Sequence, residues 1–137
     1  MEHIERKVRS LVDEFDTNDP FKIAKNLSIE IMYHPLGNIM GYYSKHFGTK
    51  IINLNESLAE EEMEFVCAHE LGHAIQHPDT NTPFLKRNTL FSTEKIEQEA
   101  NVFALNLLFL EWQLDDPLLI EIALNKYGIP QKLLTRI

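Results

Sequence analysis

Two histidines four residues apart, with a glutamate directly after the first, are the residues of this chain best suited to chemistry. They lie in the segment His69-Glu70-Leu71-Gly72-His73. On an α-helix, residues four apart share one face, so both imidazoles can reach one metal ion. Glu70 projects beside them, where it can take a proton from a metal-bound water. The spacing therefore predicts a catalytic Zn²⁺ site with His69 and His73 as ligands and Glu70 as the general base.

The residues around this motif favour a long helix. Residues 60–64 (EEEME) are rich in acid and suit the positive end of a helix dipole. Ser57 is expected to be the N-cap, with Glu60 three residues later as in a capping box. Pro78 is expected to end the helix. Gly72 costs about 1 kcal/mol of helix stability relative to Ala, which makes sense if a backbone or a substrate passes close by, or if the position is a neutral packing site.

A catalytic zinc usually takes three protein ligands and leaves the fourth position to water, so a third ligand is expected downstream. Residues 92–108 predict a helix that begins at Ser92 or Thr93 and carries an apolar stripe. Glu97 lies at the edge of this stripe, where a buried carboxylate needs a partner such as a metal. Asn101, one turn later, can hydrogen-bond a ligating imidazole. We therefore predict Glu97 as the third ligand.

Other side chains near the motif are alternatives to Glu97. Asp79 stands ten residues after His69, where extended HExxH motifs of another protease group have their last ligand. That group has Gly at the position of Gln76, so a loop aspartate is favoured for Asp79. His77 is favoured as a helix-end histidine beside the negative end of the dipole. Two further carboxylates lie near the start of the predicted helix or on its far side: Glu94 and Glu99.

The elements that must position these residues are helices and a small sheet. Apolar spacing predicts helices at 4–15 and 20–27, and alternation predicts strands at 29–34, 39–44 and 50–55. After these come the helix that carries His69 and His73, a polar loop at 79–89, the helix predicted at 92–108 and a final helix at 117–126. The predicted class is α+β: a small zinc-metallopeptidase domain with helices packed on a short three-stranded antiparallel or mixed sheet, and the HExxH motif on a central helix.

An edge strand beside the metal helix would be able to hold an extended peptide through backbone hydrogen bonds. Residues 39–44 or 50–54 are the candidates for that edge, and a plain half-buried sheet is the alternative. Three polar side chains nearby are candidates for stabilising the oxyanion, although strand aromatics more often serve packing: Tyr42, Tyr43 and His46.

Two motifs therefore occur in order, HELGHAIQH at 69–77 and EQEANVFALNLL at 97–108. Together they resemble the ImmA/IrrE family of metallopeptidases, which has HExxH followed by a helix of the form E-x-x-A-N-x-F-A-x-x-L-L. The stretches GYY at 41–43 and IINLN at 51–55 are also similar to the strands that precede the family's active-site helix. The resemblance covers roughly residues 20–110. The chain departs from many members after residue 108, where it has Phe109-Leu110 in place of Met-Pro.

The resemblance implies a zinc-dependent, gluzincin-like endopeptidase that cuts a transcriptional repressor, often one guarding a prophage, a mobile element or a stress-response gene. It implies His69 and His73 as ligands, Glu70 as the base and Glu97 as the third ligand. The implied partner is a DNA-binding repressor. Several members also carry a helix-turn-helix or a C-terminal sensor domain, and we expect neither in this chain.

Composition agrees with a small enzyme. The 137 residues are expected to form one domain, 1–137. The net charge of −8 would repel DNA, so direct nucleic-acid binding is not expected, whereas an acidic body could attract a basic substrate. The sequence has no apolar run of about 18 residues, and its first residues lack the apolar core of a signal peptide, so no membrane contact is expected. Cys67 is the only cysteine and is expected to be buried, which fits a reducing cytoplasm.

Two hypotheses from other classes stand beside the protease. The first is a metal-containing interaction module that binds a repressor without cleaving it. Glu70 argues against it, because a structural metal site needs no base. The second is a helical scaffold in which HExxH is accidental, and the second motif argues against that. Metal content separates the scaffold from the other two, and cleavage of a partner separates the protease from the module.

Overall fold

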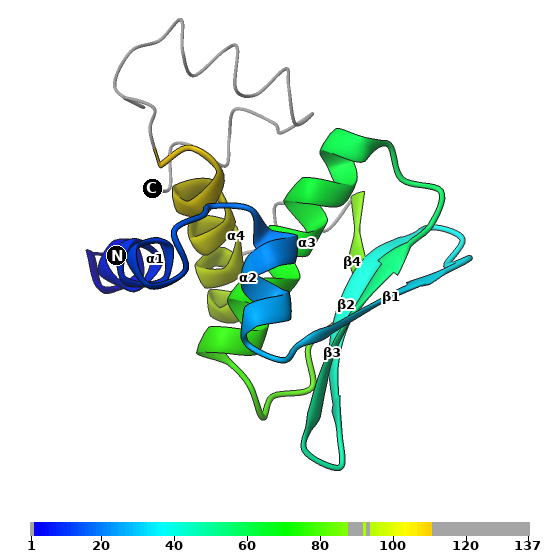
Figure 1. The fold of residues 1–137 in the computed structure, drawn as a ribbon. Helices are drawn as coiled ribbons and strands as arrows, with labels where there is room; N and C mark the ends of the chain where they lie inside the picture. Colours follow the sequence, from blue (N-terminus) through cyan, green and yellow to red (C-terminus); the bar gives the residue numbers. More distant parts are fainter. Residues whose placement is uncertain (1, 88–91, 93, 111–137) are drawn as a thin grey trace, which may run out of the picture.

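The computed structural model describes residues 2–87, 92 and 94–110, and the final helix predicted at 117–126 lies outside this part of the chain. Within it the elements run in this order: α1 (Glu2–Phe15), α2 (Pro20–Asn26), β1 (Glu30–His34), β2 (Ile39–His46), β3 (Thr49–Asn55), α3 (Glu60–Gln76), β4 (Leu85–Lys86) and α4 (Lys95–Leu108). The four helices lie on one side of the sheet, and the turn between β2 and β3 projects beyond them (Figure 1). The α+β class is confirmed.

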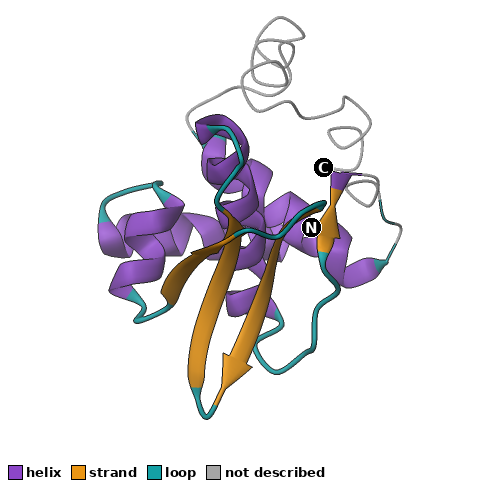
Figure 2. Ribbon diagram, turned by 90° about the vertical axis from the view of Figure 1, so that its right-hand side faces the viewer, coloured by secondary structure: helices purple, strands orange, loops and turns teal. Residues whose placement is uncertain are grey.

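The sheet is mixed and has a fourth strand that the sequence does not predict. Its order is β1-β3-β2-β4, with β1 parallel to β3 and both β2 pairings antiparallel. Figure 2 shows the strands side by side, with helices packed behind them. Strand β4 falls in the predicted polar loop, because a two-residue strand is too short to show alternation. Strand β3 lies inside the sheet, so the prediction that 50–54 could form an edge is wrong.

Close contact between β2 and α3 places the sheet directly against the motif helix. A Cβ on Gly41 would lie 2.7 Å from Val66 Cγ1 and 2.8 Å from the Asn53 carbonyl oxygen. Real Cβ atoms essentially never approach other atoms that closely, so a side chain at position 41 would force β2 away from the helix. Glycine at this position therefore sets the spacing between sheet and helix.

Helix α3 is the central helix of the described fold, as predicted. Its residues from Phe65 to Ala74 are all buried, between the sheet on one side and α4 on the other. A Cβ on Gly72 would meet three atoms of Phe103 at 3.1–3.2 Å, so the close neighbour is a side chain of α4. This approach lets α4 pack closely against the part of α3 that carries the motif. None of the described helices is both long and apolar enough to cross a bilayer.

Both helices of the site begin slightly later than predicted. The N-cap of α3 is Ala59, and Ser57 instead donates its hydroxyl to Asn55 Oδ1 at 2.7 Å. The N-cap of α4 is Glu94, whose backbone N–H is accepted by Ser92 Oγ at 3.2 Å. In each case the expected serine makes a side-chain hydrogen bond before the helix, Ser57 with the Asn55 side chain and Ser92 with the Glu94 backbone.

Candidate metal centre

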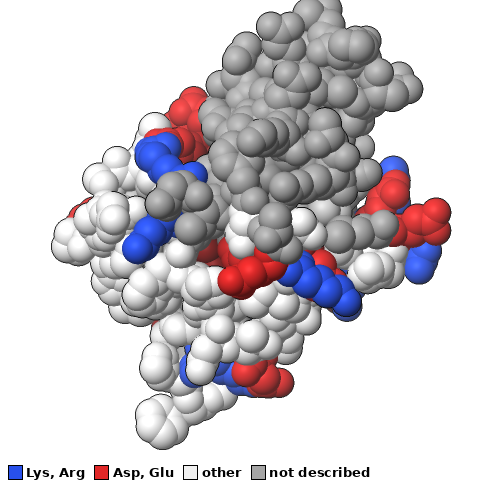
Figure 3. Space-filling view, turned by 180° about the vertical axis from the view of Figure 1, so that it is seen from behind, with Lys and Arg blue, Asp and Glu red and all other residues white. Residues whose placement is uncertain are grey.

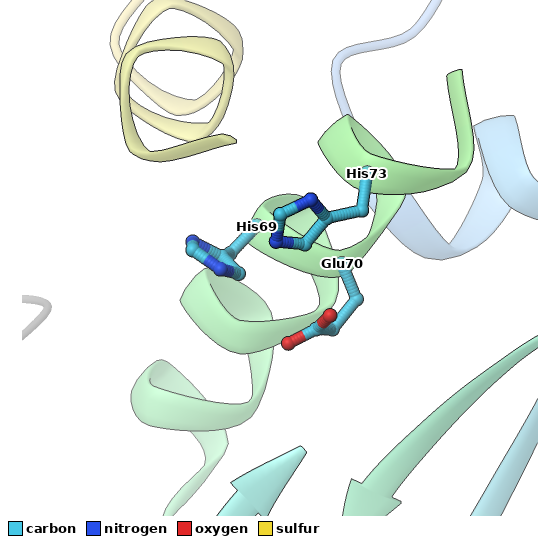
Figure 4. A group of neighbouring side chains, drawn as sticks. All are labelled: His69, Glu70 and His73. Atoms are coloured by element: carbon cyan, nitrogen blue, oxygen red, sulfur yellow. The ribbon is translucent and has the colours of Figure 1, made fainter. Parts of the chain in front are cut away.

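The two candidate ligands and the candidate base of the motif, His69, His73 and Glu70, lie close together on one side of α3. Their ligand atoms lie within 4.8 Å of one another, and all three side chains are fully buried. Figure 4 shows the imidazoles of His69 and His73 on the side of the helix that faces α4, with the carboxylate of Glu70 beside them. The four-residue spacing therefore produces the shared face that the sequence predicts.

Glu97 reaches this group from the first turn of α4. Its Oε2 lies 3.3 Å from His69 Nε2 and its Oε1 lies 2.7 Å from His73 Nε2. Glu97 is itself buried. The structure thus brings together all four residues that the sequence analysis selected, and both histidines present the same ring nitrogen to the carboxylate.

The polar atoms of this cluster are poorly satisfied. Five buried atoms have no hydrogen-bond partner within the described residues: Nε2 of His69 and His73, Oε1 of Glu97, and both carboxylate oxygens of Glu70. The 2.7 Å separation between His73 Nε2 and Glu97 Oε1 is short, yet the two atoms lack the angular geometry of a hydrogen bond. Leaving buried polar atoms unpaired costs free energy. Two imidazoles and one carboxylate that converge in this way fit a divalent metal ion.

Burial and neighbouring charges act oppositely on the two carboxyl groups. Burial raises the pKa of Glu70 to about 8. Burial alone would also raise the pKa of Glu97, but contacts with the two imidazoles outweigh it and lower that pKa to about 2. Glu97 is therefore the ionised member of the cluster, suited to neutralising a cation. A cation nearby would also favour the charged form of Glu70.

Each histidine has a polar neighbour on its other ring nitrogen. His69 Nδ1 lies 2.8 Å from Asn101 Oδ1, which is the hydrogen bond that the sequence predicts. An amide oxygen only accepts, so His69 carries its proton on Nδ1 and leaves the Nε2 lone pair free for a metal. On the other side, His73 Nδ1 lies 3.0 Å from His77 Nδ1.

A second contact extends from His77 and was missed by the sequence analysis. His77 is the C-cap residue of α3, as predicted, but its Nε2 also lies 3.1 Å from Glu99 Oε1. The four-residue spacing between His73 and His77 was the signal that could have placed their rings together. The pairing with Glu99 depends on how α3 and α4 cross, which spacing alone does not give.

Two of the other candidate ligands, Asp79 and Glu94, do not join the cluster. Asp79 Oδ1 accepts a hydrogen bond from Lys45 Nζ at 2.7 Å on the surface, so Asp79 is a loop aspartate as predicted. Glu94 is exposed at the N-cap of α4. Cys67 is fully buried, also as predicted.

No described interaction connects the three oxyanion candidates to the cluster. The Tyr43 hydroxyl donates to the Pro78 carbonyl oxygen at 2.7 Å. Tyr42, the residue before Tyr43, lies on the opposite face of β2, as alternation requires, and packs against Phe84 with ring centroids 4.9 Å apart. His46 ends β2 and is exposed. The oxyanion role of each therefore stays a prediction.

The sequence of this chain matches a known protein family. The family described as the IrrE N-terminal-like domain, a peptidase family, matches residues 24–116. The chain belongs to this family. It is 43% identical over 110 residues to "Uncharacterized immunity region protein 2" of Bacillus phage phi105, covering 80% of this chain and 70% of that protein.

Two further relatives come from Bacillus subtilis strain 168. The chain is 31% identical over 117 residues to metallopeptidase ImmA, covering 84% of this chain and 68% of that protein. It is also 31% identical over 108 residues to the phage-like element PBSX protein XkdA, covering 75% of this chain and 51% of that protein. The resemblance to the ImmA/IrrE family, in its phage-associated form, is confirmed.

Proposed function

We propose that this protein is a zinc-dependent, gluzincin-like endopeptidase with its metal held by His69, His73 and Glu97. The observation that carries the proposal is the convergence of four buried side chains between α3 and α4, with five of their polar atoms making no hydrogen bond among the described residues. A core selected only for stability would pair or remove such atoms, because each one costs free energy. Membership of a peptidase family supports the same conclusion.

The residues of the chain have separate tasks in this proposal. The zinc ion would polarise the peptide carbonyl and lower the pKa of an attacking water towards ~7. Glu70 accepts the proton of that water on a carboxylate oxygen while the new C–O bond forms. Glu70 then passes the proton to the leaving amine nitrogen as the C–N bond breaks. Glu97 supplies one negative charge against the cation.

The proposed substrate is a DNA-binding transcriptional repressor. Support comes from the names of two relatives, an immunity region protein and metallopeptidase ImmA. Surface charge adds little to this argument. On the face shown in Figure 3, acidic and basic side chains lie beside one another and form no broad patch of one sign among the described residues. On this face, therefore, charge of one sign would not guide a substrate, and recognition there would depend on shape and on local contacts.

Strand β2 offers a place for an extended substrate. Its pairing with β4 involves only Ile39 and Gly41, and no described strand pairs with the outer edge of residues 42–46. A cavity of about 500 Å³ is lined by residues 42–46 of β2, by residues 78–82 of the loop that follows α3, and by Phe84. A peptide added here would use backbone hydrogen bonds, which tolerate many side chains.

The direct test is cleavage of the candidate repressor by the wild-type protein and by Glu70→Gln. Glutamine keeps the size of the side chain but cannot take the proton. We expect the zinc content to be unchanged and the rate of cleavage to fall about 10²- to 10⁴-fold. Peptide products would be identified by mass spectrometry. Robust cleavage by Glu70→Gln would contradict the role of Glu70, and relief of repression without cleavage would favour a binding module.

A further inference from the structure

We propose that His77 and Glu99 form a directed hydrogen-bond relay that fixes the tautomer of His73 and aims its Nε2 at the metal. This inference rests on the proposed metal site but concerns two residues outside it. Both act through His73, so they are positioning residues. The relay runs from a fully buried ligand to the rim of the molecule.

The contacts form a continuous line across the two helices. His73 Nδ1 lies 3.0 Å from His77 Nδ1, and His77 Nε2 lies 3.1 Å from Glu99 Oε1. The side chains of His77 and Glu99 are only 9% and 16% exposed, so water competes weakly with both contacts. Their outer side borders a cavity of about 330 Å³ that is also lined by Lys7 of α1.

Hydrogen-bond chemistry gives the line a direction. Two ring nitrogens 3.0 Å apart must comprise one donor and one acceptor. His73 Nε2 needs its lone pair for the metal, so His73 carries its proton on Nδ1 and donates to His77 Nδ1. His77 then carries its proton on Nε2 and donates to Glu99, whose carboxylate only accepts. Each assignment fixes the next, and no other arrangement of neutral imidazoles satisfies both contacts.

The two ligand histidines are supported differently. His69 donates to the amide oxygen of Asn101, which carries no net charge. The line from His73 reaches a carboxylate only through His77, where Glu99 makes His77 a better acceptor for the His73 N–H. Helix α4 supplies the third ligand, Glu97, and both outer ends of this network, Asn101 and Glu99. The register of α3 against α4 therefore sets the orientation of all three ligands.

The end of α3 is held by the backbone of His77 and not by its side chain. The N–H of His77 donates to the His73 carbonyl oxygen at 2.7 Å, so replacing the side chain leaves this bond in place. Gln76 provides a matched control, because its Nε2 donates to the carbonyl oxygens of Gly72 and Glu99 and touches no ligand. Loss of Gln76 weakens the same helix pair, including a bond to the backbone of Glu99, but removes none of the side-chain contacts of the relay.

The experiment compares wild type, His77→Leu, His77→Asn and Gln76→Ala, first stripped of metal. Zinc affinity is measured by competition with a chromophoric chelator, and the visible spectrum of the Co²⁺ form reports the ligand geometry. We expect His77→Leu to weaken zinc binding about 10- to 100-fold and to alter the Co²⁺ spectrum. Asparagine places an acceptor oxygen where Nδ1 was, so His77→Asn should recover most of the affinity. Gln76→Ala should bind zinc as the wild type does.

The outcomes separate the relay from the proposed function. Wild-type affinity and spectrum in His77→Leu would overturn the relay while leaving the zinc site intact. Equal losses in His77→Leu and Gln76→Ala would also overturn it, in favour of general packing. If His77→Leu does not fold, Glu99→Ala decides, because alanine removes the acceptor for His77 Nε2. A tenfold or greater loss of zinc affinity in Glu99→Ala with normal folding supports the relay, and wild-type affinity overturns it. Absence of zinc binding in every form, wild type included, would instead refute the proposed function.

Discussion

Two groups of buried polar side chains in this molecule differ in how they are satisfied. Asn53 and Asn55 of β3 are 4% and 3% exposed, and each makes hydrogen bonds on both its oxygen and its nitrogen. The cluster between α3 and α4 is equally buried, yet five of its atoms make no hydrogen bond among the described residues. Because the two asparagines of the sheet are fully hydrogen-bonded, their role is architectural. The side chains between α3 and α4 converge without such hydrogen bonds, which indicates a site for a ligand.

The strongest test of this contrast is removal of metal. A ligand that binds only the folded state stabilises it by about 4 kcal/mol when present at a thousand times its dissociation constant. Chelation should therefore lower the thermal unfolding midpoint of the wild-type protein markedly. Glu97→Ala, which lacks one ligand, should respond much less. Calorimetry with and without chelator measures both, and identical responses of the two proteins would contradict ligation by Glu97.

The sheet should behave in the opposite way. Asn55 donates to the carbonyl oxygens of Gly37 and Ile39 and accepts from Ser57. Asn55→Ala leaves these groups without their partner, so we expect a loss of about 3 kcal/mol in unfolding free energy with no change in zinc affinity. Urea denaturation measures the loss. The matched control is Asn26→Ala, which removes an exposed side-chain bond to Lys22 and should cost less than about 0.5 kcal/mol.

The smallest effect is expected at Asn101, which shares features with both groups of buried polar side chains. Asn101 is buried and paired like the sheet asparagines, but its partner is a proposed ligand, His69. Asn101→Ala should weaken zinc binding about 10- to 100-fold, which corresponds to about 1.4–2.7 kcal/mol. Chelator competition checks the affinity. A change in folding stability without a change in affinity would place Asn101 with the architectural residues.

Much of the candidate site could be predicted from sequence because local spacing fixes it. His69, Glu70 and His73 share a helix, so their relative placement follows from helix geometry alone. Glu97 could be found because a carboxylate on a buried stripe needs a partner. Gly72 was noticed as a cost to the helix, but only the structure shows that Phe103 occupies the space beside it.

The features that sequence could not supply depend on contacts between elements. Strand β4 is two residues long and carries no periodic signal. The pairing of His77 with Glu99 requires the crossing of α3 and α4, and neither helix encodes that crossing by itself. The helix starts were displaced because Ser57 and Ser92 both bond within the preceding turn. Tertiary context, rather than propensity, decided each of these cases.

The central claim is that His69, His73 and Glu97 hold one zinc ion. Metal content of purified protein tests it most directly, with wild type compared with Glu70→Gln and Glu97→Ala. We predict about one zinc per chain in wild type and in Glu70→Gln, because the base is not a ligand, and loss of zinc in Glu97→Ala. No bound zinc in any form, even after zinc is supplied, would contradict the claim.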